Sequence, residues 1–146
     1  MERRTINPWS WQDNFGFVQA YEVRGQQRTL IRSGQTSFDE NATPVHEGDM
    51  AAQWNKALDN LETVLKQAGM DLSNVVRLNY YTTDVDAFMG AYEAGVSRLA
   101  QVGCRPASTL LGVQRLFLPT LIDRARGAGG GVGVVSGRAA LGLTDA

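Results

Sequence analysis

The residues best placed to do chemistry lie in segment 105–113, where a turn leads into a buried strand. Arg105 carries a guanidinium group, whose planar fork suits a bidentate carboxylate contact. Ser108 and Thr109 carry hydroxyl groups that can hydrogen-bond a ligand, although a serine in a strand that follows a turn more often has a structural role. Arg105 likewise has an alternative interpretation as a surface or interface cation. The segment therefore predicts either a polar ligand site or a structural turn.

Composition narrows the class of protein. The 146 residues carry a formal net charge of −1, which predicts one domain and favours neither nucleic acid nor an anionic membrane as partner. A single cysteine, Cys104, fits a reducing cytoplasm, and we expect it to be a packing residue. A single histidine, His46, cannot build a zinc site by itself, so we expect no metal. We expect neither a signal peptide nor a membrane span, and a cytoplasmic location.

Two segments have the hydrophobic periodicity of amphipathic helices. The first covers residues 49–68, and Gly69 follows it as a C-terminal stop. The second covers about residues 85–102, behind an aspartate that can cap it. Gly90 and Gly95 lie inside the second helix and each costs about 1 kcal/mol relative to alanine. Such glycines indicate close packing against a neighbouring element, or an altered sequence.

Strands are expected at 15–23, 28–33, 75–82 and 109–116, where β-branched, aromatic or leucine residues are bounded by turn residues. Residues between the first two predict a hairpin, and further strands are possible at 5–6 and after residue 121. Helices that alternate with these strands predict a two-layer α+β sandwich with the helices on one face. The other face of the sheet would be covered most simply by further copies of the chain.

Two features do not fit a regular domain. Arg32 falls in an otherwise apolar run and, like Arg115, is expected at the surface or at an interface. Residues 124–146 include seven glycines among 23 residues, a composition that weakens a strand and favours a flexible appendage. We therefore assign residues 1–123 to the domain and the remainder to a glycine-rich tail. We also consider that the sequence from about residue 123 onward arises from a frameshift, by accident or by engineering.

Five short motifs occur in the order in which one family of small proteins has them. They are Phe17-Val18-Gln19-Ala20, Ser33-Gly34-Gln35, Gln53 with Ala57-Leu58-Asp59-Asn60-Leu61, Tyr81-Thr82-Thr83-Asp84 with Phe88, and Pro106-Ala107-Ser108-Thr109 before Gly112-Val113. On these motifs the chain resembles the reactive-intermediate deaminase (Rid) family, also called the YjgF family, over about residues 14–123.

The resemblance implies a chorismate-mutase-like homotrimer with a mixed β-sheet and two helices on its outer face. It also implies ligand clefts between subunits. The deaminases of the family hydrolyse enamines and imines such as 2-aminoacrylate to a 2-oxo acid and ammonia, and they need neither a metal nor an organic cofactor.

The resemblance also assigns site residues. Ser108 stands where the family has the arginine that holds the substrate carboxylate, and Asp123 stands where it has a water-holding glutamate. Arg105 is a candidate substitute for the missing arginine, so these three are the candidate catalytic residues. Phe17 stands at an aromatic position that carries a hydroxyl in many relatives. The candidate ligand-binding residues are Phe17, Ser33, Gly34, Tyr92, Ala107 and Thr109.

These replacements leave three functions open. The chain is a deaminase-like hydrolase with weak or no activity on 2-imino acids, or a module that binds a small metabolite without turning it over. The third alternative is a structural trimer that forms a larger assembly. The loss of a cation that pairs with a carboxylate commonly costs a few kcal/mol, and hence orders of magnitude in rate. This loss favours weak turnover of carboxylate-bearing substrates.

Overall fold

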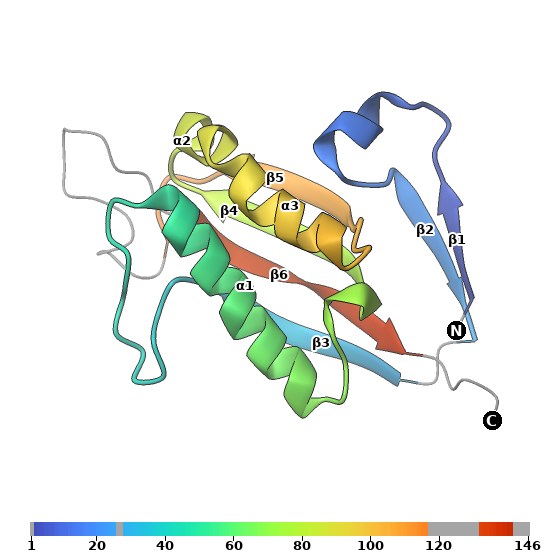
Figure 1. The fold of residues 1–146 in the computed structure, drawn as a ribbon, viewed down its shortest axis with the longest axis horizontal. Coiled ribbons are helices and arrows are strands. Elements are labelled where there is room, and N and C mark those ends of the chain that lie inside the picture. Colours follow the sequence, from blue (N-terminus) through green and yellow to red (C-terminus); the bar gives the residue numbers. More distant parts are fainter. Residues whose placement is uncertain (1, 26–27, 117–131, 142–146) are drawn as a thin grey trace.

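A four-stranded mixed sheet forms the main body of the computed structural model, which describes residues 2–25, 28–116 and 132–141. Its strand order is β3 (Arg28–Gln35), β6 (Val132–Leu141), β4 (Val75–Thr82) and β5 (Ala107–Gly112). Strand β5 runs parallel to β4, whereas β6 pairs antiparallel with both β3 and β4. Helices α1 (Met50–Gln67) and α3 (Tyr92–Gln101) lie on the same face of this sheet (Figure 1). The predicted α+β class with a mixed sheet is confirmed.

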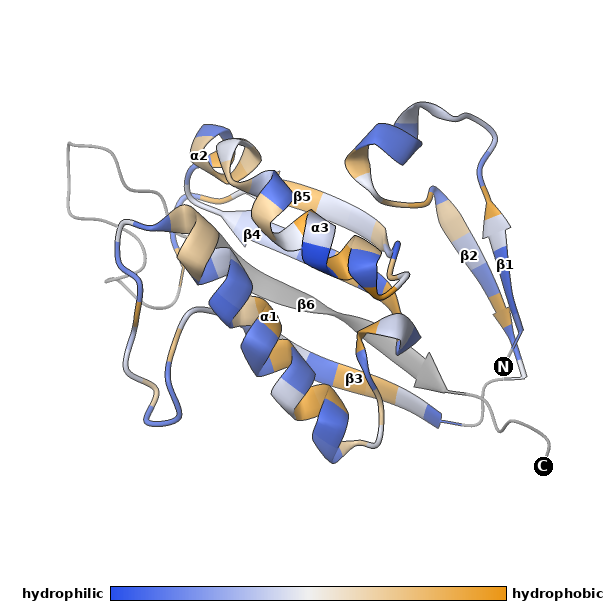
Figure 2. Cartoon of the chain, in the orientation of Figure 1, coloured by the Kyte–Doolittle hydropathy of each residue, from blue (hydrophilic) through white to orange (hydrophobic). Residues whose placement is uncertain are grey.

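Helix α1 follows the predicted pattern. The side chain of Asp49 accepts a hydrogen bond from the backbone N–H of Ala52 at 2.9 Å, which caps the first turn. Gly69 follows the helix with a φ of 67°, a left-handed conformation that glycine adopts without a Cβ clash. Blue and orange alternate along the helix in Figure 2, as the amphipathic pattern requires. The residues it buries are Met50, Gln53, Trp54, Ala57, Leu58, Leu61 and Leu65.

The second predicted helix is divided in two. Helix α2 (Val85–Gly90) begins behind Asp84, whose carboxylate accepts from the N–H of Ala87 at 2.9 Å, and α3 starts after Ala91. The division falls beside Gly90, which has a low helix propensity. Figure 1 shows that α2 and α3 follow each other along the same side of the sheet.

The strands at the N-terminal end differ from the prediction. Residues 11–15 form a short 3-10 helix, η1 (Trp11–Phe15), and β2 (Ala20–Arg24) begins only after it. Strand β2 pairs antiparallel with β1 (Glu2–Ile6), which confirms the extra strand near residues 5–6. The predicted hairpin between β2 and β3 is therefore wrong, because β2 forms a separate two-stranded sheet (Figure 1) and β3 pairs with β6.

The glycine-rich tail contributes a strand to the centre of the sheet. The backbone of β6 pairs with β3 on one side and with β4 on the other. The expectation of a flexible appendage is therefore wrong for residues 132–141. Ladder hydrogen bonds on both edges use only backbone groups, so they offset the weak strand propensity of glycine. The apolar run at residues 121–123 lies outside the described residues.

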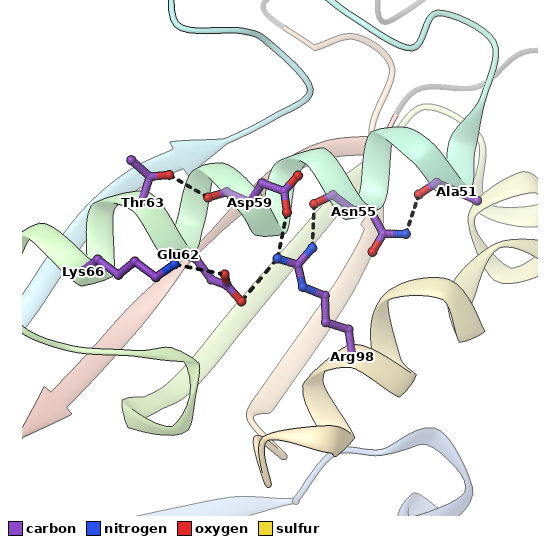
Figure 3. Close-up of polar contacts among 7 residues, drawn as sticks. All are labelled: Ala51, Asn55, Asp59, Glu62, Thr63, Lys66 and Arg98. Carbon is purple, nitrogen blue, oxygen red and sulfur yellow. Dashed lines mark hydrogen bonds and ion pairs between the residues drawn. The ribbon is translucent and has the colours of Figure 1, made fainter.

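An ion-pair network joins α1 to α3 (Figure 3). Arg98 of α3 places Nη2 2.7 Å from Oδ1 of Asp59 and 3.2 Å from Oε1 of Glu62, both on α1. Its Nη1 also donates to the backbone oxygen of Asn55 at 3.2 Å. Lys66 lies 3.9 Å from Glu62 at the end of the network. One half-buried guanidinium therefore holds the two helices together on their solvent side.

The side chains of Arg32 and Cys104 are both buried. Arg32 is 8% exposed, so its predicted place at the surface is wrong, whereas Arg115 is exposed as predicted. Burial lowers the pKa of the Arg32 guanidinium to about 10. Cys104 is 2% exposed, and burial raises the pKa of its thiol to about 12. The prediction that Cys104 is a packing residue is confirmed by its place in the core.

Candidate functional site

Strand β5 presents its candidate residues on two different faces of the sheet. Ser108 is in register with Leu78, a fully buried core residue, so Ser108 faces the helix layer. Thr109 is in register with Asn79 on the other face, where Arg77 donates from Nη2 to Thr109 Oγ1 and from Nε to Asn79 Oδ1. The sheet alternation thus separates Ser108 from Thr109, although they are adjacent in the sequence.

The segment between η1 and β2 lies against the start of β5. The N–H of Val18 donates to the carbonyl of Pro106 at 3.3 Å, and Val18 forms an isolated parallel bridge with Ala107. The hydroxyl of Tyr21 donates to the carbonyl of Arg105 at 3.0 Å. Phe17, which precedes Val18, is therefore next to the strand that carries Ala107.

The same segment is fixed to α3. The hydroxyl of Tyr92 donates to the carbonyl of Phe15 at 2.9 Å. Gly16 has a φ of 70°, and a Cβ at this position would lie 2.7 Å from Cγ2 of Val96. Only glycine combines this backbone conformation with such a close approach. Burial raises the pKa of the Tyr92 phenol, so this hydroxyl stays a hydrogen-bond donor at neutral pH.

An ion pair occupies the guanidinium of Arg105. Its Nη2 lies 2.6 Å from Oδ1 of Asp13, a residue of η1, and the two side chains are 42% and 51% exposed. Gln12 is buried, and its Nε2 donates to the same Oδ1 at 3.4 Å. Both contacts orient the Asp13 carboxylate. Asp13 was not among the predicted site residues, because its role depends on a contact 92 positions away in the sequence.

Two aromatic residues, Trp11 and Phe15, flank Asp13 within η1, and both have ring contacts with Phe17. The ring centroids of Trp11 and Phe17 are 5.8 Å apart with an interplanar angle of 71°, and those of Phe15 and Phe17 are 6.5 Å apart at 39°. Trp11 is 52% exposed and Phe15 is 44% exposed. Of these three aromatic residues, only Phe17 was predicted as a site residue from the sequence. The aromatic content of residues 9–17 was the signal that could have identified the others.

The structure brings some of the predicted residues together and separates others. Phe17, Tyr92, Arg105, Ala107 and Ser108 come from neighbouring segments around the start of β5.

Ser33 and Gly34 belong to β3, at the other edge of the sheet. Three strand spacings, about 14 Å, separate β3 from β5. One chain therefore does not place Ser33 beside Ser108. Asp123 lies outside the described residues, so its predicted catalytic role stays a prediction.

Residue types at the site limit its chemistry to that of hydroxyls, carboxylates and guanidinium groups. The described residues contain no group of three or more His, Cys, Asp or Glu side chains that could hold a metal ion. No helix in the described part of the chain is both long and apolar enough to cross a membrane.

Comparisons with known proteins agree on one family. A family model described as Endoribonuclease L-PSP matches residues 14–122. A RutC family protein of Aquifex aeolicus is 29% identical over 107 residues, which are 73% of this chain and 82% of that protein. The 2-iminobutanoate/2-iminopropanoate deaminase of Rattus norvegicus is 36% identical over 61 residues, 42% of this chain and 44% of that enzyme. The chain thus spans about half the length of some curated relatives that it matches.

A solved structure extends this similarity to nearly the whole chain. YyfB from Yersinia pestis, described as a protein of unknown function of the conserved Rid protein family, is 32% identical and has a TM-score of 0.78. The match covers 97% of this chain and 100% of YyfB.

Proposed function

Because the chain belongs to the family of the Endoribonuclease L-PSP model, which its relatives call the RutC or Rid family, we propose that it acts on or binds small imines. The reaction would be hydrolysis without a metal or organic cofactor. Water adds to the imine carbon, the carbon–nitrogen bond then breaks, and ammonia leaves while a carbonyl group forms. We further propose that the chain has little activity on 2-imino acids.

One observation carries this proposal: the residue between Ala107 and Thr109 is a serine, and the nearby Arg105 is paired with Asp13. A 2-imino acid needs a cation for its carboxylate, and a serine hydroxyl supplies only one neutral hydrogen bond. Removal of a charged partner commonly costs a few kcal/mol, which corresponds to a rate loss on the order of 100-fold or more. A substrate without a carboxylate would not be affected by this replacement.

The site is proposed to lie between copies of the chain in a homotrimer. Ser33 and Gly34 lie on the strand at the opposite edge of the sheet from Ser108, so a second copy would have to supply them. Ser108 faces the helix layer from the edge strand β5, so the cleft would lie at this edge of the sheet. Assembly has separate support on the sheet face away from the helices, which carries Ile31, 72% exposed, and Leu111, 48% exposed. Burial of such apolar side chains against another copy would be favourable. Light scattering measures the assembly, and a mass above that of a trimer would support the structural alternative.

A turnover assay tests the proposed function. Ammonia-releasing hydrolysis competes with semicarbazide for the imine, so a fall in semicarbazone formation reports turnover. We expect the unmodified protein to hydrolyse 2-iminopropanoate slowly and Ser108→Arg to hydrolyse it at least about tenfold faster. Gln101→Arg adds the same charge at the exposed end of α3 and serves as the control. Fast turnover by the unmodified protein would contradict the proposal.

A metabolite-binding module is the second candidate function. Phe17 supports it, because a phenyl ring binds apolar ligands but offers no hydroxyl to orient a reacting water. Such a module would bind imines or amines without changing semicarbazone formation in the same assay.

An RNA substrate has weaker support despite the name of the family model. With a net charge of −1, the chain lacks the excess of positive charge with which proteins usually neutralise phosphates. We therefore propose no nucleic-acid partner. We also propose a cytoplasmic location, because a chain with a single cysteine forms no internal disulfide and needs no oxidising compartment.

A further inference from the structure

Three aromatic rings form a partly exposed surface beside the Arg105–Asp13 pair. We define Trp11, Phe15 and Phe17 as the aromatic corner, since the rings of Trp11 and Phe17 meet at 71°. Trp11 and Phe15 are each about half exposed. Exposed large aromatic side chains that lie together are unusual on a soluble domain and mark places where a ligand or partner binds. The corner is held in place by the contacts of Phe15 and Gly16 with α3.

The charge preference of this corner follows from its chemistry. Aromatic faces carry partial negative charge, so they attract cations and repel anions. Both hydrogen bonds to Asp13 fall on Oδ1. Among the described residues Oδ2 therefore accepts no hydrogen bond, and it is available to an N–H donor of a ligand. Arg105, the cation next to the corner, is neutralised by Asp13.

We infer that the aromatic corner binds a protonated amine or iminium ion that carries an apolar substituent and no carboxylate. The substituent packs on Trp11 and Phe17, and the N–H donors reach Oδ2 of Asp13. The choice of this ligand rests on the proposed function, because protonated imines are the reactive form in imine hydrolysis. It also gives the proposed function a substrate class that fits Ser108, since no carboxylate has to be held.

Three ligands of the same shape test the charge preference on the unmodified protein. Phenethylamine is a cation at pH 7, 2-phenylethanol is neutral and phenylacetate is an anion. Titration calorimetry at low salt, with tryptophan fluorescence as a second readout, gives each dissociation constant. We expect the amine to bind about fivefold more tightly than the alcohol, and the anion more weakly than both. Equal affinities, or tighter binding of the anion, would overturn the inference. Equal affinities would instead indicate an apolar contact surface.

Substitutions at Arg105 and at Asp13 should change the affinity for the amine in opposite directions. A purely structural role of the ion pair would not produce this difference. Arg105→Gln removes the cation that competes for Asp13, so amine affinity should rise. Asp13→Asn removes the negative charge and one of the two acceptor oxygens, so Arg105 is no longer neutralised and the preference should change from the amine to phenylacetate. Asp86→Asn removes an exposed carboxylate of α2 and should leave the order of affinities as it is. The same change in Asp86→Asn as in Asp13→Asn would show that net charge alone decides, and would contradict the inference.

Phe17→Leu separates the aromatic contribution from simple apolar burial. Leucine keeps most of the apolar surface and removes the negatively charged face. The amine should then lose its advantage of about fivefold, while the alcohol should bind about as before. If the amine keeps its advantage in Phe17→Leu and also in Trp11→Leu, the corner does not recognise the charge.

The outcomes also separate this inference from the proposed function. Tight amine binding without turnover of any imine would contradict the proposed hydrolysis and leave the inference standing. Turnover of imines together with no preference for the amine would contradict the inference alone.

Discussion

Gly95 of α3 lies directly against the indole of Trp54 on α1: a Cβ built on Gly95 would lie 1.9 Å from Nε1 of Trp54. The indole N–H donates to the carbonyl of Tyr92 at 3.4 Å, one turn before this glycine. Trp54 is fully buried, and its ring centroid is 5.2 Å from that of Tyr80 on β4. The two helices and the sheet therefore meet at one ring, and the missing side chain of Gly95 makes the room for it.

Gly95→Ala should destabilise the protein strongly. The methyl group overlaps ring atoms that are enclosed on all sides, so either the tryptophan or the helix has to move. Such overpacking typically costs 1–3 kcal/mol, and we expect about 3 kcal/mol in the free energy of unfolding by urea denaturation. Gly90→Ala is the control, because no atom lies within 4 Å of a Cβ there. It should be neutral or stabilising by up to about 1 kcal/mol. Equal effects of the two variants would contradict the packing argument.

Arg98→Met should weaken the contact between α1 and α3. The half-buried guanidinium contacts Asp59, Glu62 and the carbonyl of Asn55, and charge-assisted hydrogen bonds are stronger than neutral ones. We expect a loss of about 1–2 kcal/mol in the free energy of unfolding, which becomes smaller in high salt. Lys66→Met is the control, since this exposed pair at 3.9 Å should contribute only about 0–0.5 kcal/mol. A loss that does not change with salt would contradict the ion-pair explanation, because methionine keeps most of the aliphatic stem of Arg98.

Cys104 should be unreactive in the folded protein. Burial raises the pKa of its thiol to about 12, so at pH 8 about one molecule in ten thousand carries the thiolate that reacts. A disulfide reagent at pH 8 should therefore label the native protein slowly and the urea-unfolded protein fast. Ala100→Cys places a thiol at an exposed position of α3 and should react at once in the native state. Immediate stoichiometric labelling of Cys104 would show that the core opens readily.

Local patterns predicted the elements that are stabilised locally. Asp49 and the apolar stripe behind it identified α1 within a residue at each end, and the β-branched, aromatic and leucine residues of 75–82 identified β4. Pairing was not predictable in the same way. Strand β6 separates β3 from β4, and its glycines hide it from any pattern of side chains. A central strand depends on backbone hydrogen bonds to both neighbours, which have no sequence signature.

Part of the candidate site could be predicted, because the motif around Ser108 lies on one strand. The neighbours of that motif could not. Asp13 reaches Arg105 only after η1 folds back on β5, and Trp11 reaches Phe17 through the same turn. The αL conformation of Gly16 makes this turn possible. The hypothesis of a frameshift after residue 123 is tested by the encoding DNA and stays a hypothesis.

Arg32→Met should stabilise the protein, and the gain should depend on pH. Burial is the main cause that lowers the pKa of Arg32 to about 10, and Tyr80 and Cys104 act in the opposite direction. Below pH 10 the guanidinium is charged in both the folded and the unfolded state, so the folded state carries the cost of a buried charge. Methionine has similar length and no charge, so we expect a gain of about 1–2 kcal/mol at pH 7.

Above pH 10 this gain should become smaller. The folded state then loses the proton of Arg32, while the unfolded state keeps it to higher pH because its guanidinium has the ordinary, higher pKa. The unmodified protein therefore gains stability relative to Arg32→Met. Urea unfolding at pH 7, 9 and 10.5 measures the difference between the two proteins. Tyr80 is common to both, so its own titration largely cancels from this difference. Arg28→Met on the exposed part of the same strand should show no such dependence on pH. If the difference in unfolding free energy between the two proteins stays constant across this pH range, burial does not lower the pKa of Arg32 and the explanation is wrong.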